Sequence, residues 1–194
     1  IKVIDGYKTT QNKLGSDIDG EAANDYSGTS VSFNEDNTIM AIGAAYNDGT
    51  ASNAGHVRIY QYSGGSWTKL GSDIDGEAAD DLSGFTVSLS SDGTIVAIGS
   101  RKNDGTGSDA GHVRVYKYNG SAWTKLGDDI DGEAEDDLSS QSVSLSSDGT
   151  TVAIGAYLND GTGTGAGGGG ASGNGGGANT NDGGDGSAGI VFVR

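Results

Sequence analysis

Short stretches of alternating apolar and polar residues run along the chain, separated by glycine, asparagine and aspartate. In the middle of the chain, residues 86–89 alternate, and residues 94–99 are almost continuously apolar, as in a strand buried on both faces. Residues 113–118 and 123–126 follow, with an Asn-Gly turn between them. Apolar residues never recur with the 3.6-residue period of a helix. The pattern predicts an all-β fold made of units of four short strands.

This four-stranded unit occurs three times. Leu14, Leu70 and Leu126 are spaced by 56 residues, and Trp67 and Trp123 keep the same spacing. Four short strands per repeat are typical of a β-propeller blade. The chain therefore divides into blade repeats at residues 1–56, 57–112 and 113–194. The third repeat contains a glycine-rich insertion at residues 166–187.

The three copies read SGTSVSFNEDNTIMAIGAAYNDG, SGFTVSLSSDGTIVAIGSRKNDG and SSQSVSLSSDGTTVAIGAYLNDG. They resemble FG-GAP repeats, the blades of integrin-α-like β-propellers, and the resemblance covers residues 1–165 and 188–194. Ser83-Gly84 stands where the family has Phe-Gly, and the chain has no proline for the end of the family's Gly-Ala-Pro. The resemblance implies a propeller in an extracellular adhesion or surface protein.

Both ends of the chain fall at the same phase of the repeat, within the predicted third strand. Closed propellers have four to eight blades, so three blades do not form a ring alone. The chain is then part of a larger propeller, half of a six-bladed dimer, or a unit that joins head to tail by strand complementation. Its expected partners are copies of itself or further blades. The predicted assembly edges are Ile1, Val3, Val191 and Val193.

The motif Asp-Ile-Asp-Gly-Glu-Ala also occurs three times and suggests calcium, the one cofactor that the sequence points to. Calcium prefers carboxylate and carbonyl oxygens in a glycine-assisted turn. The alternative is a set of carboxylates that form turns on an acidic rim. The calcium loop of FG-GAP blades is not carried over, because Ser91-Asp92-Gly93 is too short. The candidate ligands are Asp17, Asp19, Glu21, Asp25, Asp73, Asp75, Glu77, Asp81, Asp129, Asp131, Glu133 and Asp137.

Charge and residue types argue against several classes of function. A formal net charge of −16 argues against a nucleic-acid partner, which needs a lysine and arginine surface. The apolar runs are too short for membrane insertion. His56 and His112 share one repeat position that holds Ile190 in the third copy, which indicates packing rather than general base catalysis. With no cysteine and no base paired to a nucleophile, we predict that the chain is not an enzyme.

The glycine-rich insertion leaves two interpretations open. It is either a flexible surface loop or a recognition tip, since it is similar to glycine-rich tips of phage tail-fibre and adhesin proteins. We expect a non-enzymatic structural or adhesion module, extracellular on a cell or virion surface. The alternatives are a viral or phage receptor-binding fibre and a carbohydrate-active propeller enzyme. A cell-surface glycan or protein receptor is the expected partner, and Asn119 is a glycosylation site if a eukaryote secretes the chain.

Overall fold

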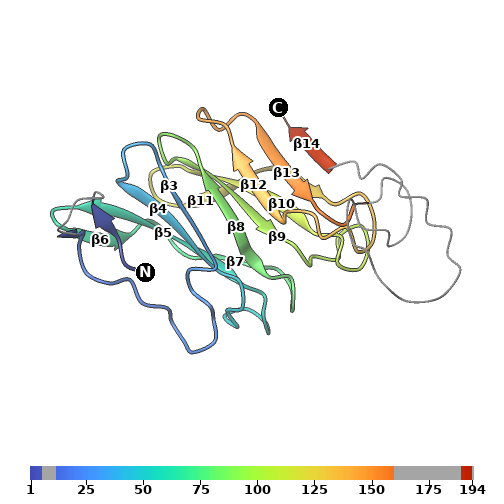
Figure 1. The fold of residues 1–194 in the computed structure, drawn as a ribbon, viewed down its shortest axis with the longest axis horizontal. Helices are drawn as coiled ribbons and strands as arrows, with labels where there is room; N and C mark the ends of the chain where they lie inside the picture. Colours follow the sequence, from blue (N-terminus) through green and yellow to red (C-terminus); the bar gives the residue numbers. More distant parts are fainter. Residues whose placement is uncertain (6–11, 160–188, 194) are drawn as a thin grey trace, which may run out of the picture.

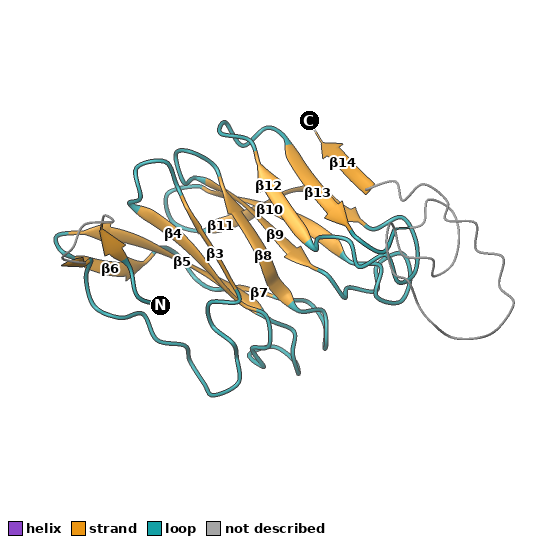
Figure 2. Cartoon of the chain, in the orientation of Figure 1, coloured by secondary structure: helices purple, strands orange, loops and turns teal. Residues whose placement is uncertain are grey.

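The computed structural model describes residues 1–5, 12–159 and 189–193. These residues form fourteen β-strands and no helix (Figure 2), so the prediction of an all-β fold is confirmed for them. No helix suited to crossing a membrane occurs in this part of the chain. The glycine-rich insertion lies outside the described residues.

The strands are short and form antiparallel sheets. They are β1 (Ile4–Asp5), β2 (Asn12–Lys13), β3 (Ser30–Phe33), β4 (Ile39–Ala44), β5 (His56–Ser63), β6 (Ser66–Lys69), β7 (Ile74–Asp75), β8 (Ser83–Leu89), β9 (Ile95–Ser100), β10 (His112–Tyr118), β11 (Trp123–Asp131), β12 (Ser142–Leu145), β13 (Val152–Ala156) and β14 (Gly189–Val193). β1 and β2 form a hairpin. Sheet 1 has the order β3-β4-β5-β6, with β7 also paired to β5; sheet 2 is β8-β9-β10-β11; sheet 3 is β12-β13-β14. The sheets follow one another along the molecule from the N-terminal hairpin to β14 (Figure 1).

The second strand of each sheet carries the long apolar run, and neighbouring strands flank it on both sides. In sheet 2, β9 pairs with β8 and β10, and all its residues after Ile95 are buried. β11 runs to Asp131 because a bulge between Val113 and Val115 lets β10 stay paired along its length. In sheet 1 the same stretch is split into β6 and β7. In the second and third copies the first residues of the acidic motif therefore lie in strand, and the turn is shorter than predicted, whereas in the first copy they lie outside any strand.

The apolar core lies between successive sheets rather than inside one sheet. The hairpin and sheet 1 enclose Val3, Ile18, Met40 and Ile42. Sheets 1 and 2 enclose Ala41, Val57, Ile59, Ile74, Val87, Leu89, Val96 and Ile98. Sheets 2 and 3 enclose Ala97, Val113, Val152 and Ile154. The sheets thus stack face to face, and most of the apolar burial that stabilises the chain occurs at these interfaces.

Hydrogen bonds between the sheets repeat with the sequence. The amide of Leu89 donates to Ser32 Oγ at 3.0 Å, and the amide of Leu145 donates to Ser88 Oγ at 2.9 Å. The backbones also approach closely: a Cβ added to Gly43 would lie 2.0 Å from the Gly84 carbonyl oxygen. The 56-residue period is therefore a repeat of interfaces as well as of strands.

The two ends of the described chain differ from each other. Val3 is buried in the first core, with Ile1 packed against it. β14 places Val191 opposite Ile154 and Val193 opposite Val152. Its register is shifted by one residue from the sequence phase, because Ile190 faces Gly155 where Val113 faces Gly99 in sheet 2. Assembly through these four residues stays a prediction, as does the number of blades, since the described sheets form no closed ring.

Candidate functional site

The last aspartate of each acidic motif is buried and pairs with an asparagine. Asp81 is buried and accepts hydrogen bonds from Asn103 Nδ2 at 3.0 Å and from the amide of Ala78 at 3.2 Å. The equivalent pairs are Asp25 with Asn47, at 2.8 Å, and Asp137 with Asn159, at 3.0 Å. Burial raises the pKa of Asp81 although the Asn103 hydrogen bond opposes the rise. Each Asp–Asn pair joins the turn before the first strand of a sheet to the loop after the second strand of the same sheet.

A second set of carboxylates converges on arginine. Arg114 on β10 donates from Nε to Asp129 Oδ1 at 2.9 Å and from Nη2 to Asp129 Oδ2 at 2.7 Å, and it also pairs with Glu77. Lys125 adds a bond to Asp129 at 2.7 Å. The hydrogen bonds from Arg114 hold the pKa of Asp129 far below its usual range. Burial opposes ionisation of Arg114, but its bonds to Asp129 raise its pKa.

The same cluster recurs one repeat earlier around Arg58. There Arg58 pairs with Glu21 and, at 3.3 Å, with Asp73, whose other oxygen accepts a bond from Lys69 at 2.6 Å. A buried histidine lies beside each cluster. Burial lowers the pKa of His56, as it does for His112, so both favour the neutral form and fit the predicted packing role.

These clusters are the only places in the described part of the chain where potential metal ligands gather. Glu77, His112 and Asp129 have ligand atoms within 4.8 Å of one another, as do their equivalents one repeat earlier. A charged guanidinium lies among them and already pairs with both carboxylates, so each cluster is an ion-pair network between a turn and a sheet. Calcium needs six to eight oxygen ligands, which this arrangement does not supply.

The remaining candidate ligands are exposed. Asp17 pairs with Lys13 at 2.8 Å, a surface contact that contributes little to stability. Glu133 accepts a bond from Asn159 at 3.3 Å. Asp19, Asp75 and Asp131 lie at the surface. In the third copy Asp131, Glu133 and Asp137 line one small pocket, where Asn159 already donates to Glu133 and Asp137. The geometry favours structural roles for the twelve candidates.

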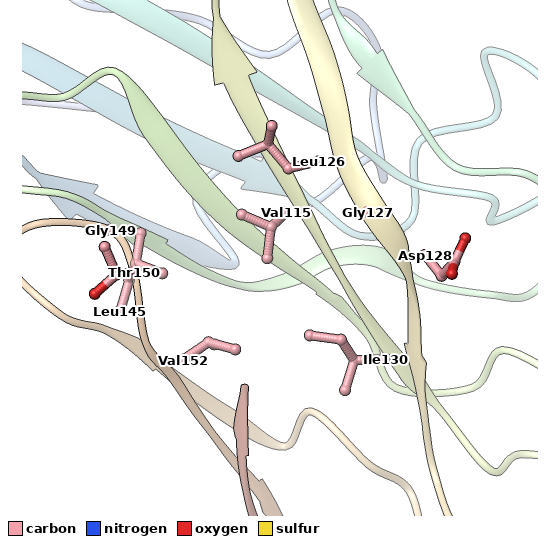
Figure 3. Close-up of a pocket in the computed structure, with 9 residues that line it drawn as sticks. All are labelled: Val115, Leu126, Gly127, Asp128, Ile130, Leu145, Gly149, Thr150 and Val152. Carbon is pink, nitrogen blue, oxygen red and sulfur yellow. The ribbon is translucent and has the colours of Figure 1, made fainter. Parts of the chain in front are cut away.

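An apolar cavity of about 280 Å³ lies between sheets 2 and 3. In Figure 3 the side chains of Val115, Ile130 and Val152 point into a common space. Leu126, which lines it too, is 41% exposed. The full lining is Val115, Leu126, Gly127, Asp128, Ile130, Leu145, Gly149, Thr150 and Val152.

The lining residues correspond to core residues of the two earlier interfaces. One repeat earlier, Ile59, Leu70, Ile74, Leu89 and Val96 are packed together with Tyr116 and Trp123. Two repeats earlier, Val3, Leu14, Ile18, Phe33 and Met40 are packed together with Tyr60 and Trp67. Among the side chains that the structure describes, which do not include those of β14, no aromatic ring takes this place in the third copy. The sequence held a signal for this cavity, since Leu-Gly occurs at residues 14, 70 and 126 but tryptophan occurs only twice.

The outer face of sheet 3, like the cavity between sheets 2 and 3, lacks contacts that the earlier sheets make. In sheets 1 and 2, Ala41 and Ala97 are fully buried by the next sheet, and Ser32 and Ser88 accept hydrogen bonds from it. On sheet 3 the equivalent Ala153 is half-buried and Ser144 is exposed. In the described part of the chain, the Ser144 hydroxyl has no hydrogen-bond partner.

The loops at one end of the strands differ between copies. Tyr26 and Tyr46 pack against each other with ring centroids 4.9 Å apart and ring planes tilted by 57°. The guanidinium of Arg101 lies 3.9 Å from the centroid of the ring of Phe85, at the start of β8. Tyr157 is half-exposed in the third copy. This rim presents a different set of side chains from each sheet.

Asn119 lies on the exposed turn between β10 and β11. Its side-chain oxygen accepts bonds from the amide of Ser121 at 3.0 Å and from the Ser121 hydroxyl at 2.9 Å. Glycosylation of Asn119 stays a prediction.

No protein-family model and no curated protein matches the chain. One similar solved structure is described as a "putative 6-phosphogluconolactonase from Bacteroides uniformis ATCC 8492", with 15% identity and a TM-score of 0.43. The match covers 71% of this chain and 39% of that chain, so the chain spans about two fifths of the other protein's length. Because that structure carries the name of an enzyme, the prediction that the chain is not an enzyme is corrected and not carried further. A TM-score of this size assigns no activity to the chain.

Proposed function

We propose that the chain is a β-propeller-like structural or adhesion module at an extracellular or particle surface. It presents its variable rim on a rigid stack and joins further sheets, from copies of itself or other chains, into a ring or fibre. The outer face of sheet 3 carries this proposal, because it exposes the groups that sheets 1 and 2 use to bind the next sheet.

The outer face of sheet 3 offers two kinds of contact to a further sheet: a hydroxyl acceptor at Ser144 and a small side chain at Ala153. Ser144 stands where Ser32 and Ser88 accept the amide of a leucine from the following sheet. Ala153 stands where small, fully buried alanines allow close approach of the next backbone. An added sheet that repeats the leucine position would satisfy the same groups. Stacks of this kind extend through nearest-neighbour contacts, so each interface supports addition of the next.

The resemblance to FG-GAP repeats supports placement at a cell or virion surface. The predicted recognition tip at residues 166–187 lies outside the described residues, and a receptor-binding fibre remains the alternative form of this module. Binding of a surface glycan or protein receptor would then fall to the insertion rather than to the rim.

Sedimentation velocity over a concentration series tests the proposal. We expect species heavier than the 19.3 kDa chain, and we expect Ala153→Arg to suppress them because a long charged side chain would separate the faces. Ala79→Arg is the matched control, since Ala79 lies in an exposed turn and the change in charge is equal. A folded wild-type chain that stays monomeric at every concentration would refute self-association.

A further inference from the structure

Two tryptophan side chains bind at equivalent Leu-Gly sites, which we call seats. Trp67 binds at Leu14–Gly15, next to the hairpin, and Trp123 binds at Leu70–Gly71, next to sheet 1. Trp67 Nε1 donates to the Leu14 carbonyl at 2.9 Å, and Trp123 Nε1 donates to the Leu70 carbonyl at 2.8 Å. The residue after each leucine is glycine. A Cβ added to Gly15 would lie 2.9 Å from Trp67 Cδ1, and a Cβ added to Gly71 would lie 3.0 Å from Trp123 Cδ1. Each Leu-Gly seat thus binds one indole and has no room for a side chain beneath it.

Leu126 and Gly127 form a third seat, and none of the side chains that the structure describes fills it. A Cβ added to Gly127 would have no atom within 4 Å. The φ angle of Gly127 is 67°, close to the 76° of Gly15 and the 81° of Gly71, so the backbone already has the conformation of the occupied seats. The cavity of about 280 Å³ lies above it.

Neither tryptophan of residues 1–194 is free to fill the third seat. The chain has two tryptophans, and both are seated, so a second copy with the same fold has none to offer. In the occupied seats the tryptophan stands on the fourth strand of the following sheet, which is β6 for Trp67 and the first part of β11 for Trp123. In sheet 3 the last described strand is β14, the third of its sheet.

We propose that the Leu126–Gly127 seat binds a tryptophan side chain from a partner chain, carried on a β-strand that pairs with β14 as the fourth strand of sheet 3. The indole N–H donates to the Leu126 carbonyl, and the ring covers the apolar lining. Main-chain pairing with β14 supplies affinity, and the seat selects the side chain. Asp128 stands where the other seats have Ser16 and Ser72, so a basic residue beside the tryptophan is favoured. This goes beyond the proposed function because it uses the edge of sheet 3 rather than its outer face.

A labelled peptide that copies residues 117–127 tests the seat directly, since it contains the strand and its tryptophan. Fluorescence anisotropy with the full chain should show binding. A peptide with alanine at the tryptophan position should bind at least about tenfold more weakly, the ratio that corresponds to about 1.4 kcal/mol. Gly127→Ala should cause a similar loss, because the new methyl group occupies the place of the indole.

Gly64→Ala is the matched control. Gly64 has a φ of 59° and open space around it, so its substitution imposes the same backbone strain on the β5–β6 turn, away from the seat. Leu126→Ser, which keeps the backbone unchanged, gives a second test should Gly127→Ala fail to fold. Equal binding of the two peptides, undetectable binding to wild type, or unchanged binding to Gly127→Ala and Leu126→Ser would each overturn the proposal. Stacking through Ala153 is measured separately, so either proposal can fail while the other holds.

Discussion

At the scale of single residues, the buried histidines make stability depend on pH. Burial lowers the pKa of His56 and His112 below the usual 6.5, so near neutrality the unfolded chain binds protons that the folded chain does not. Their contribution is complete above about pH 6.5 and falls as the pH drops toward the folded pKa values. Urea unfolding should show stability decreasing from about pH 7.5 to about pH 5.5, with a smaller slope for His112→Gln.

Asp129 and Asp81 also make stability depend on pH, in opposite directions and at a lower pH than the histidines. The lowered pKa of Asp129 means that its contribution is lost only in strong acid, well below the histidine range. The raised pKa of Asp81 means that its protonation stabilises the fold as the pH falls through the folded pKa toward the ordinary pKa of an aspartate. An unchanged slope in His112→Gln would show that His112 does not cause the dependence.

The buried Asp81–Asn103 pair gives a second prediction. Asn103→Ala leaves a buried carboxylate without its amide donor, which should lower the free energy of unfolding by about 1–3 kcal/mol. Gln61→Ala is the control, because Gln61 is an exposed amide on β5 and its side chain makes no hydrogen bond within the described chain. Denaturant unfolding of both variants measures the difference, and equal losses would mean that the pair is not a clamp.

At the scale of the elements, the close stacking of the sheets determines how much an added methyl group lowers the stability of the fold. Gly43→Ala places a Cβ against the Gly84 carbonyl on β8 and should destabilise the fold by about 1–3 kcal/mol. Gly155 holds the same repeat position on sheet 3, where an added Cβ meets only the movable Ser142 side chain at its closest. Gly155→Ala should therefore cost clearly less. Thermal unfolding compares the two, and equal losses would contradict the face-to-face interface.

The strands show how far the sequence predicts the fold. The apolar run predicted at residues 94–99 is β9, at Ile95–Ser100, because continuous burial leaves a clear pattern. The prediction for the fourth strand ended at residue 126, yet β11 continues through polar residues to Asp131. A bulge permits this pairing, and local polarity gives no sign of it. The register of β14 is likewise set by pairing with β13 rather than by the repeat.

The candidate sites were harder to predict for the same reason. The Asp81–Asn103 pair joins residues 22 apart, and the Arg114–Asp129 pair joins residues 15 apart. Spacing within one acidic motif suggested a shared cation, but folding distributes its carboxylates among an asparagine, an arginine and the solvent. Only the imbalance of three Leu-Gly pairs and two tryptophans was visible in the sequence.

At the scale of the whole molecule, the pairing of the carboxylates predicts indifference to calcium. Asp73 and Asp129 already pair with an arginine and a lysine, and Asp17 pairs with Lys13. Asp81 and its equivalents are bonded to asparagine. Millimolar calcium or a chelator should leave the melting temperature unchanged, because a ligand bound only by the folded state would raise it. A calcium-dependent increase would restore the cation site suggested by the sequence.

The central claim is that the stack continues from the outer face of sheet 3 through the interface that the chain already uses. Electron microscopy of the associated form at side-chain resolution tests this most directly. We predict a further sheet on that face, with a backbone amide donating to the Ser144 hydroxyl and a close backbone contact at Ala153. An assembly whose subunits meet elsewhere, with Ser144 and Ala153 left in solvent, would contradict it.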